Sequence, residues 1–124
     1  MKNYGVLVRG EGVRVRDSDA FVVARAISAA TPAEAGEKTL AAIAEDWQRG
    51  ESARLDPGAA PNLRVIGIWR TGILGPHSLP TSGHTFFTAT DPDSEAAALR
   101  IELRVARPPL LIRLALSRSL QRAA

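Results

Sequence analysis

The sequence has no cysteine, one methionine and only six aromatic residues among its 124 positions. The absence of cysteine excludes disulfides, thiol nucleophiles, iron–sulfur clusters and cysteine-ligated zinc. No apolar run approaches the about 18 residues that a membrane span needs, and the short apolar run after Met1 stops at Arg9, well short of the apolar region of a signal peptide. We therefore expect a soluble, cytoplasmic protein.

What is present fits one ordinary globular domain, because 45% of the residues are hydrophobic and 23% are charged. The formal net charge is +3, but it is unevenly distributed. Residues 100–124 contain six arginines and one glutamate, whereas residues 1–99 contain ten basic and twelve acidic residues. We expect a single domain over 1–106 and a basic C-terminal extension over 107–124, and leave open whether that extension packs on the domain.

Three strands are expected near the N-terminus. Tyr4–Arg9 is a short β-branched run, and Val13–Arg16 alternates apolar and charged residues with a period of two. Gly10–Gly12 between them predicts a turn. Phe21–Ile27 has apolar residues at both odd and even positions, which is typical of a central strand that is buried on both sides.

The clearest helix is expected over Thr31–Arg49. Thr31 is a suitable N-cap, Pro32 suits the first helical position, and Glu34 completes a capping box. Leu40, Ile43 and Trp47 recur on one side of this helix. The pattern predicts one amphipathic helix that packs on a sheet through these three side chains.

Two further features qualify this helix. Gly36 lies within its apolar stripe, where it costs about 1 kcal/mol of helix propensity relative to alanine, so we infer that the backbone passes close to the sheet there. On the polar side, Glu34 and Lys38, and Glu45 and Arg49, are spaced for ion pairs one turn apart.

The middle of the chain alternates loops with strands. Glu51–Asn62 is expected to be a loop, followed by a strand over Leu63–Arg70 and a fifth strand over Thr85–Ala89. The intervening Gly72–Gly83 segment contains several glycines and prolines, too many for a tight hairpin. It is the best candidate for a functional loop.

The C-terminal third is ambiguous. Ser94 begins a helix-like stretch with Asp93 or Ser94 as the cap, yet Leu99–Val105 alternates strictly, as a half-exposed strand should. We favour a strand from Leu99. Arg107–Pro109 then breaks the pattern, and Leu110–Arg122 permits a helix, although its apolar residues do not form one stripe.

These elements predict an α+β fold of order β-β-β-α-β-β, a mostly antiparallel sheet of about five strands packed by one amphipathic helix, with a C-terminal strand or helix extension. One helix covers only part of such a sheet. The opposite face then needs another cover, which is either the C-terminal segment or a second subunit, and we favour a homodimer.

Few residues suggest chemistry. His77 and His84 share the glycine- and proline-rich region, and Asp91 and Asp93 follow, but their spacing matches no metal motif, so we interpret both histidines as surface loop residues and expect no metal or cofactor. Ser78 and Ser82 lie near these histidines without a nucleophile elbow or an orienting acid, so we assign no catalytic residue.

The arginines are the remaining candidates. Those at 14, 16, 25, 64 and 70 fall on expected strands. They are either a basic sheet face for RNA, with Trp69, Phe86 and Phe87 as stacking aromatics, or solvated sheet positions, which explain them about as well. The arginines of the C-terminal segment are better placed to attract phosphate or anionic lipid. The candidate binding residues are His77, His84, Arg107, Arg113, Arg118 and Arg122.

Three stretches resemble a group of small bacterial proteins of uncharacterised function. They are Tyr4–Glu11, Phe21–Ala29 followed by the helix start at Pro32–Ala35, and Gly83–Phe87. The resemblance covers about residues 1–90. It implies a fold rather than an activity.

We therefore expect a non-enzymatic module that binds another protein in an assembly or regulatory role. The alternative is a nucleic-acid-binding accessory protein that uses the arginine-rich C-terminal segment. An enzyme would require the Gly72–Gly83 loop to converge with charged residues in a pocket.

Overall fold

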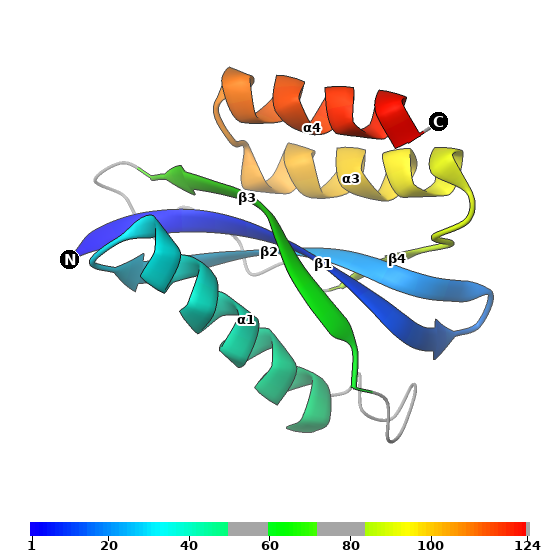
Figure 1. The fold of residues 1–124 in the computed structure, drawn as a ribbon, viewed down its shortest axis with the longest axis horizontal. Helices are drawn as coiled ribbons and strands as arrows, with labels where there is room; N and C mark the ends of the chain where they lie inside the picture. Colours follow the sequence, from blue (N-terminus) through cyan, green and yellow to red (C-terminus); the bar gives the residue numbers. More distant parts are fainter. Residues whose placement is uncertain (50–59, 72–83, 124) are drawn as a thin grey trace.

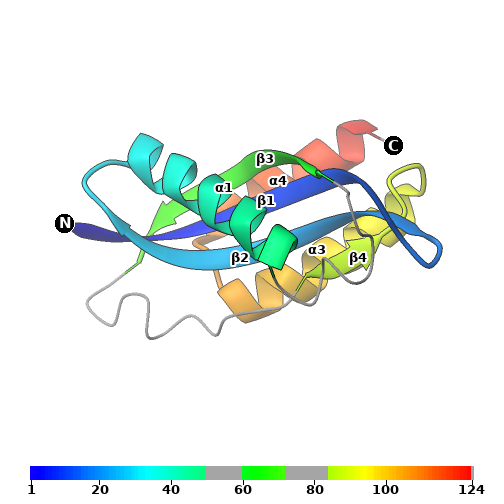
Figure 2. The same ribbon diagram turned by 90° about the horizontal axis from the view of Figure 1, so that it is seen from below.

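The computed structural model describes residues 1–49, 60–71 and 84–123, with no side chain described at 105 or at 117–123. Four antiparallel strands form one sheet in the order β3-β1-β2-β4. One helix lies on one face of this sheet and two helices lie on the other (Figures 1 and 2). The elements are β1 (Lys2–Val15), β2 (Ser18–Ala29), α1 (Pro32–Arg49), β3 (Asn62–Arg70), β4 (Thr85–Phe87), α3 (Pro92–Ala106) and α4 (Leu110–Ala123).

The α+β prediction is confirmed, but the described sheet has four strands where five were expected, because the first two expected strands form the single long β1. The predicted turn at Gly10–Gly12 is wrong. The chain reverses at Arg16, which has a φ of 56°, and Asp17. Gly12, with a φ of 82°, instead lies within β1 where its pairing with β2 shifts.

Gly10 shows why a glycine is needed inside this strand. The ring of Phe21 lies directly across it, and a Cβ atom at Gly10 would lie 2.3 Å from the Phe21 Cζ atom. Gly12 therefore allows the bulge, and Gly10 leaves room for the Phe21 ring. In a single sequence, two glycines with these roles look the same as two glycines of a turn.

Helix α1 begins after the predicted Thr31 cap, and Glu34 reaches back to the backbone N–H of Ala30 rather than to that of Thr31. The Glu34 backbone N–H donates to Thr31 Oγ1 at 3.1 Å, and Glu34 Oε2 accepts from the Ala30 backbone N–H at 3.1 Å. Lys38 Nζ lies 2.8 Å from Glu34 Oε1, and Arg49 Nη1 lies 2.9 Å from Glu45 Oε1, so both predicted ion pairs are formed. The expected helix end at Gly50, residues 51–59 of the expected 51–62 loop and the expected loop over 72–83 lie outside the described residues. Asn62, the last residue of the first expected loop, begins β3.

The apolar side of α1 packs on the sheet as expected. Ile43 and Trp47 are fully buried and Leu40 is half-buried, all against the cluster that contains Tyr4 and Phe21. A Cβ atom at Gly36 would lie 3.4 Å from Ile68 Cδ1 on β3. The helix therefore packs on β3 at Gly36, but a Cβ atom there would be in ordinary van der Waals contact, so the packing does not require glycine.

The opposite face is covered by the C-terminal segment itself. Helix α3 lies over β2 and β4, and α4 lies over β3 (Figures 1 and 2). In α4, Ile112 and Leu116 face Gly67, where a Cβ atom would lie 3.6 and 3.9 Å from their methyl carbons. The sheet therefore does not need a second subunit as the cover of this face.

The predicted strand over Leu99–Val105 is wrong, because this segment lies inside α3. The helix cap also differs from the predicted Asp93 or Ser94. The N-cap is Asp91, whose carboxylate accepts from the backbone N–H groups of the next turn, and Pro92 occupies the first helical position.

A bulge in β3 directs extra side chains toward α3 and α4. Leu7 pairs with Gly67 but the next residue, Val8, pairs with Val65, so Ile66 is inserted between them. Both Ile66 and Gly67 consequently face the C-terminal helices. Strand β3 therefore presents the Ile66 side chain to these helices, and next to it Gly67 leaves room for Ile112 and Leu116 of α4.

Candidate functional site

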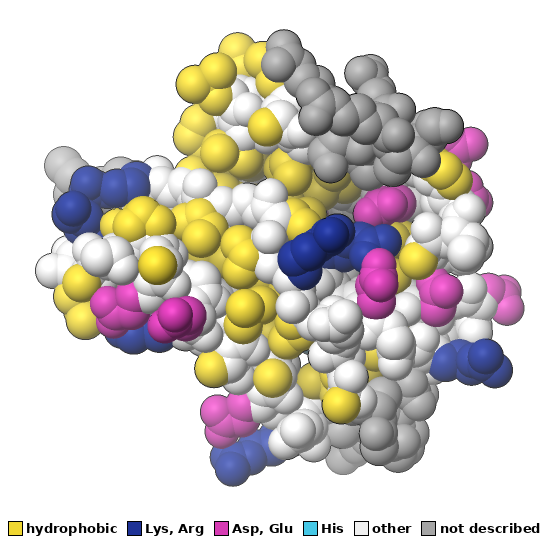
Figure 3. Space-filling view, viewed as in Figure 1, with side chains coloured by type: hydrophobic (Ala, Val, Ile, Leu, Met, Phe, Trp, Pro, Cys, Tyr) yellow, Lys and Arg dark blue, Asp and Glu magenta, His cyan; other side chains and the backbone are white. Residues whose placement is uncertain are grey.

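A pocket of about 340 Å³ lies between the sheet and the C-terminal helices. Figure 3 shows positively and negatively charged side chains meeting beside β3, below the C-terminal helices in this view. Three charged residues and several aliphatic residues line the pocket, the latter including Ile66 on β3, Leu99 on α3 and Leu116 on α4. The charged lining residues are Arg9, Arg64 and Glu95.

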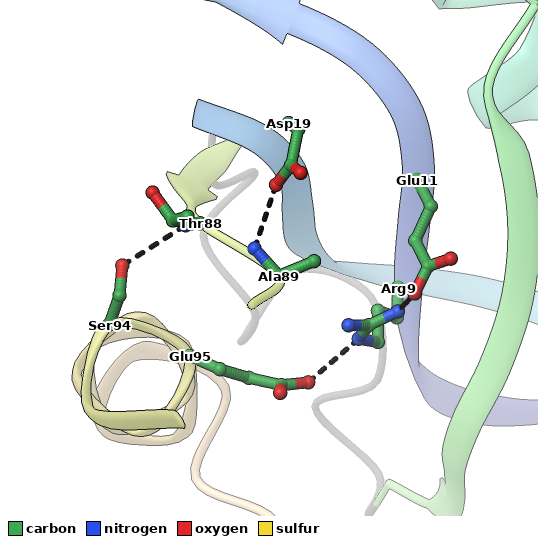
Figure 4. Close-up of polar contacts among 7 residues, drawn as sticks. All are labelled: Arg9, Glu11, Asp19, Thr88, Ala89, Ser94 and Glu95. Atoms are coloured by element: carbon green, nitrogen blue, oxygen red, sulfur yellow. Dashed lines mark hydrogen bonds and ion pairs between the residues drawn. The ribbon is translucent and has the colours of Figure 1, made fainter. Parts of the chain in front are cut away.

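Arg9 is held from three sides. Its Nε donates to Glu95 Oε1 at 2.7 Å, and its Nη1 forms an ion pair with Glu11 (Figure 4). The Phe87 ring lies beneath the guanidinium, with its centroid 5.2 Å from Arg9 Cζ, within the range of a cation–π interaction. The Arg9 side chain is only 10% exposed, so its position is fixed by charged and aromatic partners rather than by solvent.

The alternation of β1 determines which of its side chains reach this pocket. Leu7, Arg9 and Glu11 are two residues apart, and successive side chains on a strand point to opposite faces of the sheet. Tyr4, Val6 and Val8 belong to the core on the α1 side. Arg9 therefore continues the row that faces α3 and α4, directly after the buried Leu7.

Glu95 is positioned by the contacts that fix the start of α3. The Ala89 backbone N–H donates to Asp19 Oδ1 at 2.7 Å, and the Thr88 backbone N–H donates to Ser94 Oγ at 3.1 Å (Figure 4). These bonds connect the segment between β4 and α3 to the beginning of β2 and to the first turn of the helix. The Glu95 carboxylate is consequently presented to Arg9, with 18% of its side chain exposed.

Arg64 provides the accessible positive charge. It is exposed on β3 and lines both the main pocket and an adjoining cavity of about 90 Å³, which it shares with Arg9, Glu11 and Asn62. Among the described residues, no side chain or carbonyl forms an ion pair or hydrogen bond with Arg64. A guanidinium has five N–H groups, and the described contacts of Arg9 use two of its five. The site can therefore donate several hydrogen bonds to an acceptor.

His84 lies on the other side of the sheet, and the expectation of a surface histidine is wrong for it. Its ring makes an edge contact with Phe21, with centroids 4.6 Å apart, and another with Trp47 at 5.5 Å. It also lies roughly parallel to the ring of Phe86 at 6.1 Å. Burial, assisted by the charge of Arg25, lowers the pKa of His84 to about 4, so the ring is neutral near pH 7.

The other predicted site residues do not line this pocket. Arg107 ends α3 in a left-handed conformation and is exposed. Arg113, also exposed, donates from Nε to the Pro108 carbonyl at 2.9 Å. His77 and the side chains of Arg118 and Arg122 lie outside the described residues. In the part of the chain that the structure describes, no group of three or more potential metal-ligating side chains is found.

Sequence reasoning missed Arg9 and Glu95 as site residues and explained Arg64 as a solvated position. One signal was present, because Arg9 directly follows Val6–Val8, a run that is buried throughout. Charged residues are rarely buried unless they are paired, so an arginine next to a buried run implies a carboxylate partner. The sequence does not indicate that the partner is Glu95, 86 residues away.

No protein-family model, no curated protein and no solved structure matches this chain. Over the described ranges, no helix is long and apolar enough to cross a membrane. The resemblance of residues 1–90 to small bacterial proteins stays a prediction. What can be said of the function therefore rests on the geometry of the Arg9–Arg64 pocket.

Proposed function

We propose that this protein is a non-enzymatic binding domain that takes a small amphiphilic monoanion, an aliphatic carboxylate, into the pocket between the sheet and α3 and α4. The observation on which the proposal depends is a fixed guanidinium, Arg9, beside an accessible one, Arg64, at the edge of an aliphatic cavity. The expected roles in protein or nucleic-acid binding stay predictions.

The charges around the pocket favour a ligand with one negative charge. Arg9 already interacts with two carboxylates, those of Glu11 and Glu95, whereas Arg64 has no described acidic partner. A carboxylate can accept two parallel hydrogen bonds from a guanidinium. A phosphate dianion would bring a second negative charge close to Glu11 and Glu95, and like charges at short range are unfavourable.

The other walls favour an aliphatic body on the ligand. Ile66, Leu99 and Leu116 present branched aliphatic side chains to the cavity. A volume of about 340 Å³ lies at the lower end of the roughly 300–1,000 Å³ typical of ligand pockets, which favours a small molecule.

The described lining favours binding over catalysis. The residues that line the pocket are arginine, glutamate and aliphatic residues, without a serine, lysine or histidine among them. Such a set supplies hydrogen-bond donors and apolar contacts. It lacks the usual pairing of a nucleophile with a base.

The test is a titration of the isotope-labelled protein with octanoate, octanol and octylamine, followed by NMR. We expect octanoate to shift the Arg64 Nε–Hε signal and the methyl signals of Ile66 and Leu116 in a saturable way. Octylamine should have no such effect, and octanol should bind at least about tenfold more weakly, because hydrogen bonds to charged groups contribute about 1.5–3 kcal/mol.

Two arginines at the two ends of β3 provide matched variants. Arg64→Gln should weaken octanoate binding at least about tenfold, whereas Arg70→Gln, also exposed but outside the pocket, should leave it unchanged. The proposal is wrong if aliphatic carboxylates cause no saturable shifts at the pocket, or if both variants bind octanoate equally well.

A further inference from the structure

The C-terminal helices expose large apolar side chains to solvent. On α4, Leu110, Leu111 and Leu114 are 68%, 79% and 45% exposed, and on α3 Ile101 is 52% exposed. Figure 3 shows hydrophobic side chains gathered over the beginning of α4. We call the surface that contains these residues the outer helical face; it comprises Arg100, Ile101, Arg104, Arg107, Leu110, Leu111, Arg113 and Leu114.

The helical period explains why these leucines face outward. Ile112 and Leu116 are one turn apart and point to Gly67 on the sheet. Leu110 and Leu114 are also one turn apart, and at 100° per residue they lie on the opposite side of α4. The exposure is therefore a property of the docked helix, because turning these leucines inward would remove Ile112 and Leu116 from the core.

The exposed charges of the outer helical face are positive; the exposed acid Asp93 lies in the first turn of α3, seven residues before Arg100. Between residues 96 and 116, the exposed charged side chains are Arg100, Arg104, Arg107 and Arg113. The single acid in that range, Glu102, is 1% exposed, and it accepts a hydrogen bond from Thr85 Oγ1 at 2.6 Å on the inner side of α3. The outer helical face thus offers aliphatic and cationic groups together, without an exposed acid.

These chemical properties discriminate among occupants. A second copy of the chain would bring the same arginines together around a twofold axis with no acid to pair them. A nucleic acid would use the arginines but would leave the leucines in water, because its outer surface is phosphate and sugar. An anionic bilayer accommodates both groups, with leucines at the acyl boundary and arginines at the phosphates.

We propose that the outer helical face docks peripherally on an anionic phospholipid surface. The leucines of α4 enter the interface, and Arg104, Arg107 and Arg113 contact the lipid phosphates. Neither group suffices alone, because a few apolar side chains or a few charges bind a bilayer only weakly. This docking is independent of the proposed ligand of the Arg9–Arg64 pocket.

The test is flotation of the full chain with vesicles of phosphatidylcholine alone and of equimolar phosphatidylcholine and phosphatidylglycerol. We expect binding to the anionic vesicles only, and a loss of that binding in high salt. Arg104→Gln should weaken binding about fivefold, the contribution of one arginine near an anionic surface. Arg49→Gln, an exposed arginine of α1 on the other side of the sheet, is the matched control and should bind as the unmodified protein does.

A second pair of variants tests the apolar part. Leu111→Ser should weaken binding about tenfold because it removes an inserted side chain, and circular dichroism should show an unchanged fold because Leu111 is exposed. Arg64→Gln should still bind vesicles, which separates this surface from the pocket. Equal binding to both vesicle types, no binding to the anionic ones, or equal losses for Arg104→Gln and Arg49→Gln would overturn the proposal. Absence of vesicle binding would instead favour an acidic protein as the partner.

Discussion

The two faces of the sheet are packed on different principles. On the α1 side, Phe21 and Trp47 stack with centroids 5.3 Å apart and an interplanar angle of 7°, within one continuous apolar cluster. On the side of α3 and α4, the core divides into two smaller clusters, and charged residues lie between helix and sheet. The Arg9–Arg64 pocket lies on this second face.

The comparison indicates how this small domain combines stability with a binding site. Burial of large side chains against α1 supplies much of the folding free energy, since apolar burial is the main favourable term. The second face can then retain Arg9 and Glu95, whose removal from water is costly. We therefore expect substitutions on the two faces to change the free energy of unfolding by different amounts and for different physical reasons.

The largest effect is expected from Trp47→Ala, which should lower the free energy of unfolding by about 3–5 kcal/mol because it leaves a cavity beneath α1. Leu116→Ala on the other face should cost only about 2 kcal/mol, since Leu116 already borders the pocket. Gln48→Ala, an exposed change next to Trp47, is the control and should stay within about 0.5 kcal/mol. Denaturant unfolding measures all three, and equal costs for Trp47 and Leu116 would refute the contrast between the faces.

A smaller effect is expected from Arg9→Met, which should lower the free energy of unfolding by about 2 kcal/mol because Glu95 loses its partner. In a double-mutant cycle with Glu95→Gln, we expect a coupling energy of about 1 kcal/mol or more. The exposed pair of Glu45 and Arg49 gives the reference, with an expected coupling of about 0.3–0.5 kcal/mol. Equal couplings for the two pairs would show that partial burial does not strengthen the Arg9 interaction.

The pH dependence of stability tests the packing on the α1 side of the sheet. The unfolded chain binds a proton at His84 with the ordinary pKa near 6.5, whereas burial lowers the folded pKa to about 4. Stability should therefore be complete above about pH 6.5 and should fall as the pH decreases toward 4, because only the unfolded state is protonated in that window. In the His84→Phe variant, the thermal unfolding midpoint should depend less on pH between pH 6.5 and 4.5. An unchanged pH profile would show that the ring is accessible to water.

The smallest effect is expected from Gly36→Ala, which should raise the free energy of unfolding by about 0.5 kcal/mol. Alanine gains helix propensity, and its Cβ atom would meet Ile68 Cδ1 at 3.4 Å, close to ordinary contact. Gly10→Ala is the control with the opposite expected sign. Its Cβ atom would lie 2.3 Å from Phe21 Cζ, so the substitution should lower the melting temperature markedly. If Gly36→Ala lowered the stability instead, α1 would be too tightly packed on β3 to accommodate the added methyl group.

Local signals predicted the α1 half of the molecule well. The cap at Thr31 and the stripe with Ile43 and Trp47 depend on residues within one helix. Such patterns are determined by the 3.6-residue period and by the chemistry of a helix terminus, so they are visible without knowledge of the partner.

The α3 segment was mispredicted because a charged residue faces the sheet and an apolar residue faces solvent. Glu102 is buried and Ile101 is half-exposed, which creates an apparent alternation between Leu99 and Val105. The inward positions, Ala98, Leu99 and Glu102, follow the helical period only if a carboxylate is accepted as a core residue. One partner of the buried carboxylate, Thr85, lies on another element.

The pocket escaped prediction for the same reason. Arg9 and Arg64 lie on adjacent strands, but the face that Arg64 reaches relative to the rest of β3 depends on the bulge at Ile66, and bulges have no firm signature in a single sequence. The loop over Gly72–Gly83, the expected functional segment, lies outside the described residues. Contacts between residues far apart in the chain determine the described site.

The bonds at the start of α3 also have a consequence for the order of folding. The Thr88 hydroxyl donates to the Asp17 carbonyl, the Ala89 N–H donates to Asp19, and Arg9 donates to Glu95, across separations of 71, 70 and 86 residues. Closing loops of this length is entropically costly before other contacts repay it. The β1–β2 hairpin and α1, joined by near neighbours in the chain, can therefore form a nucleus first, and the C-terminal helices dock on that template as the late step.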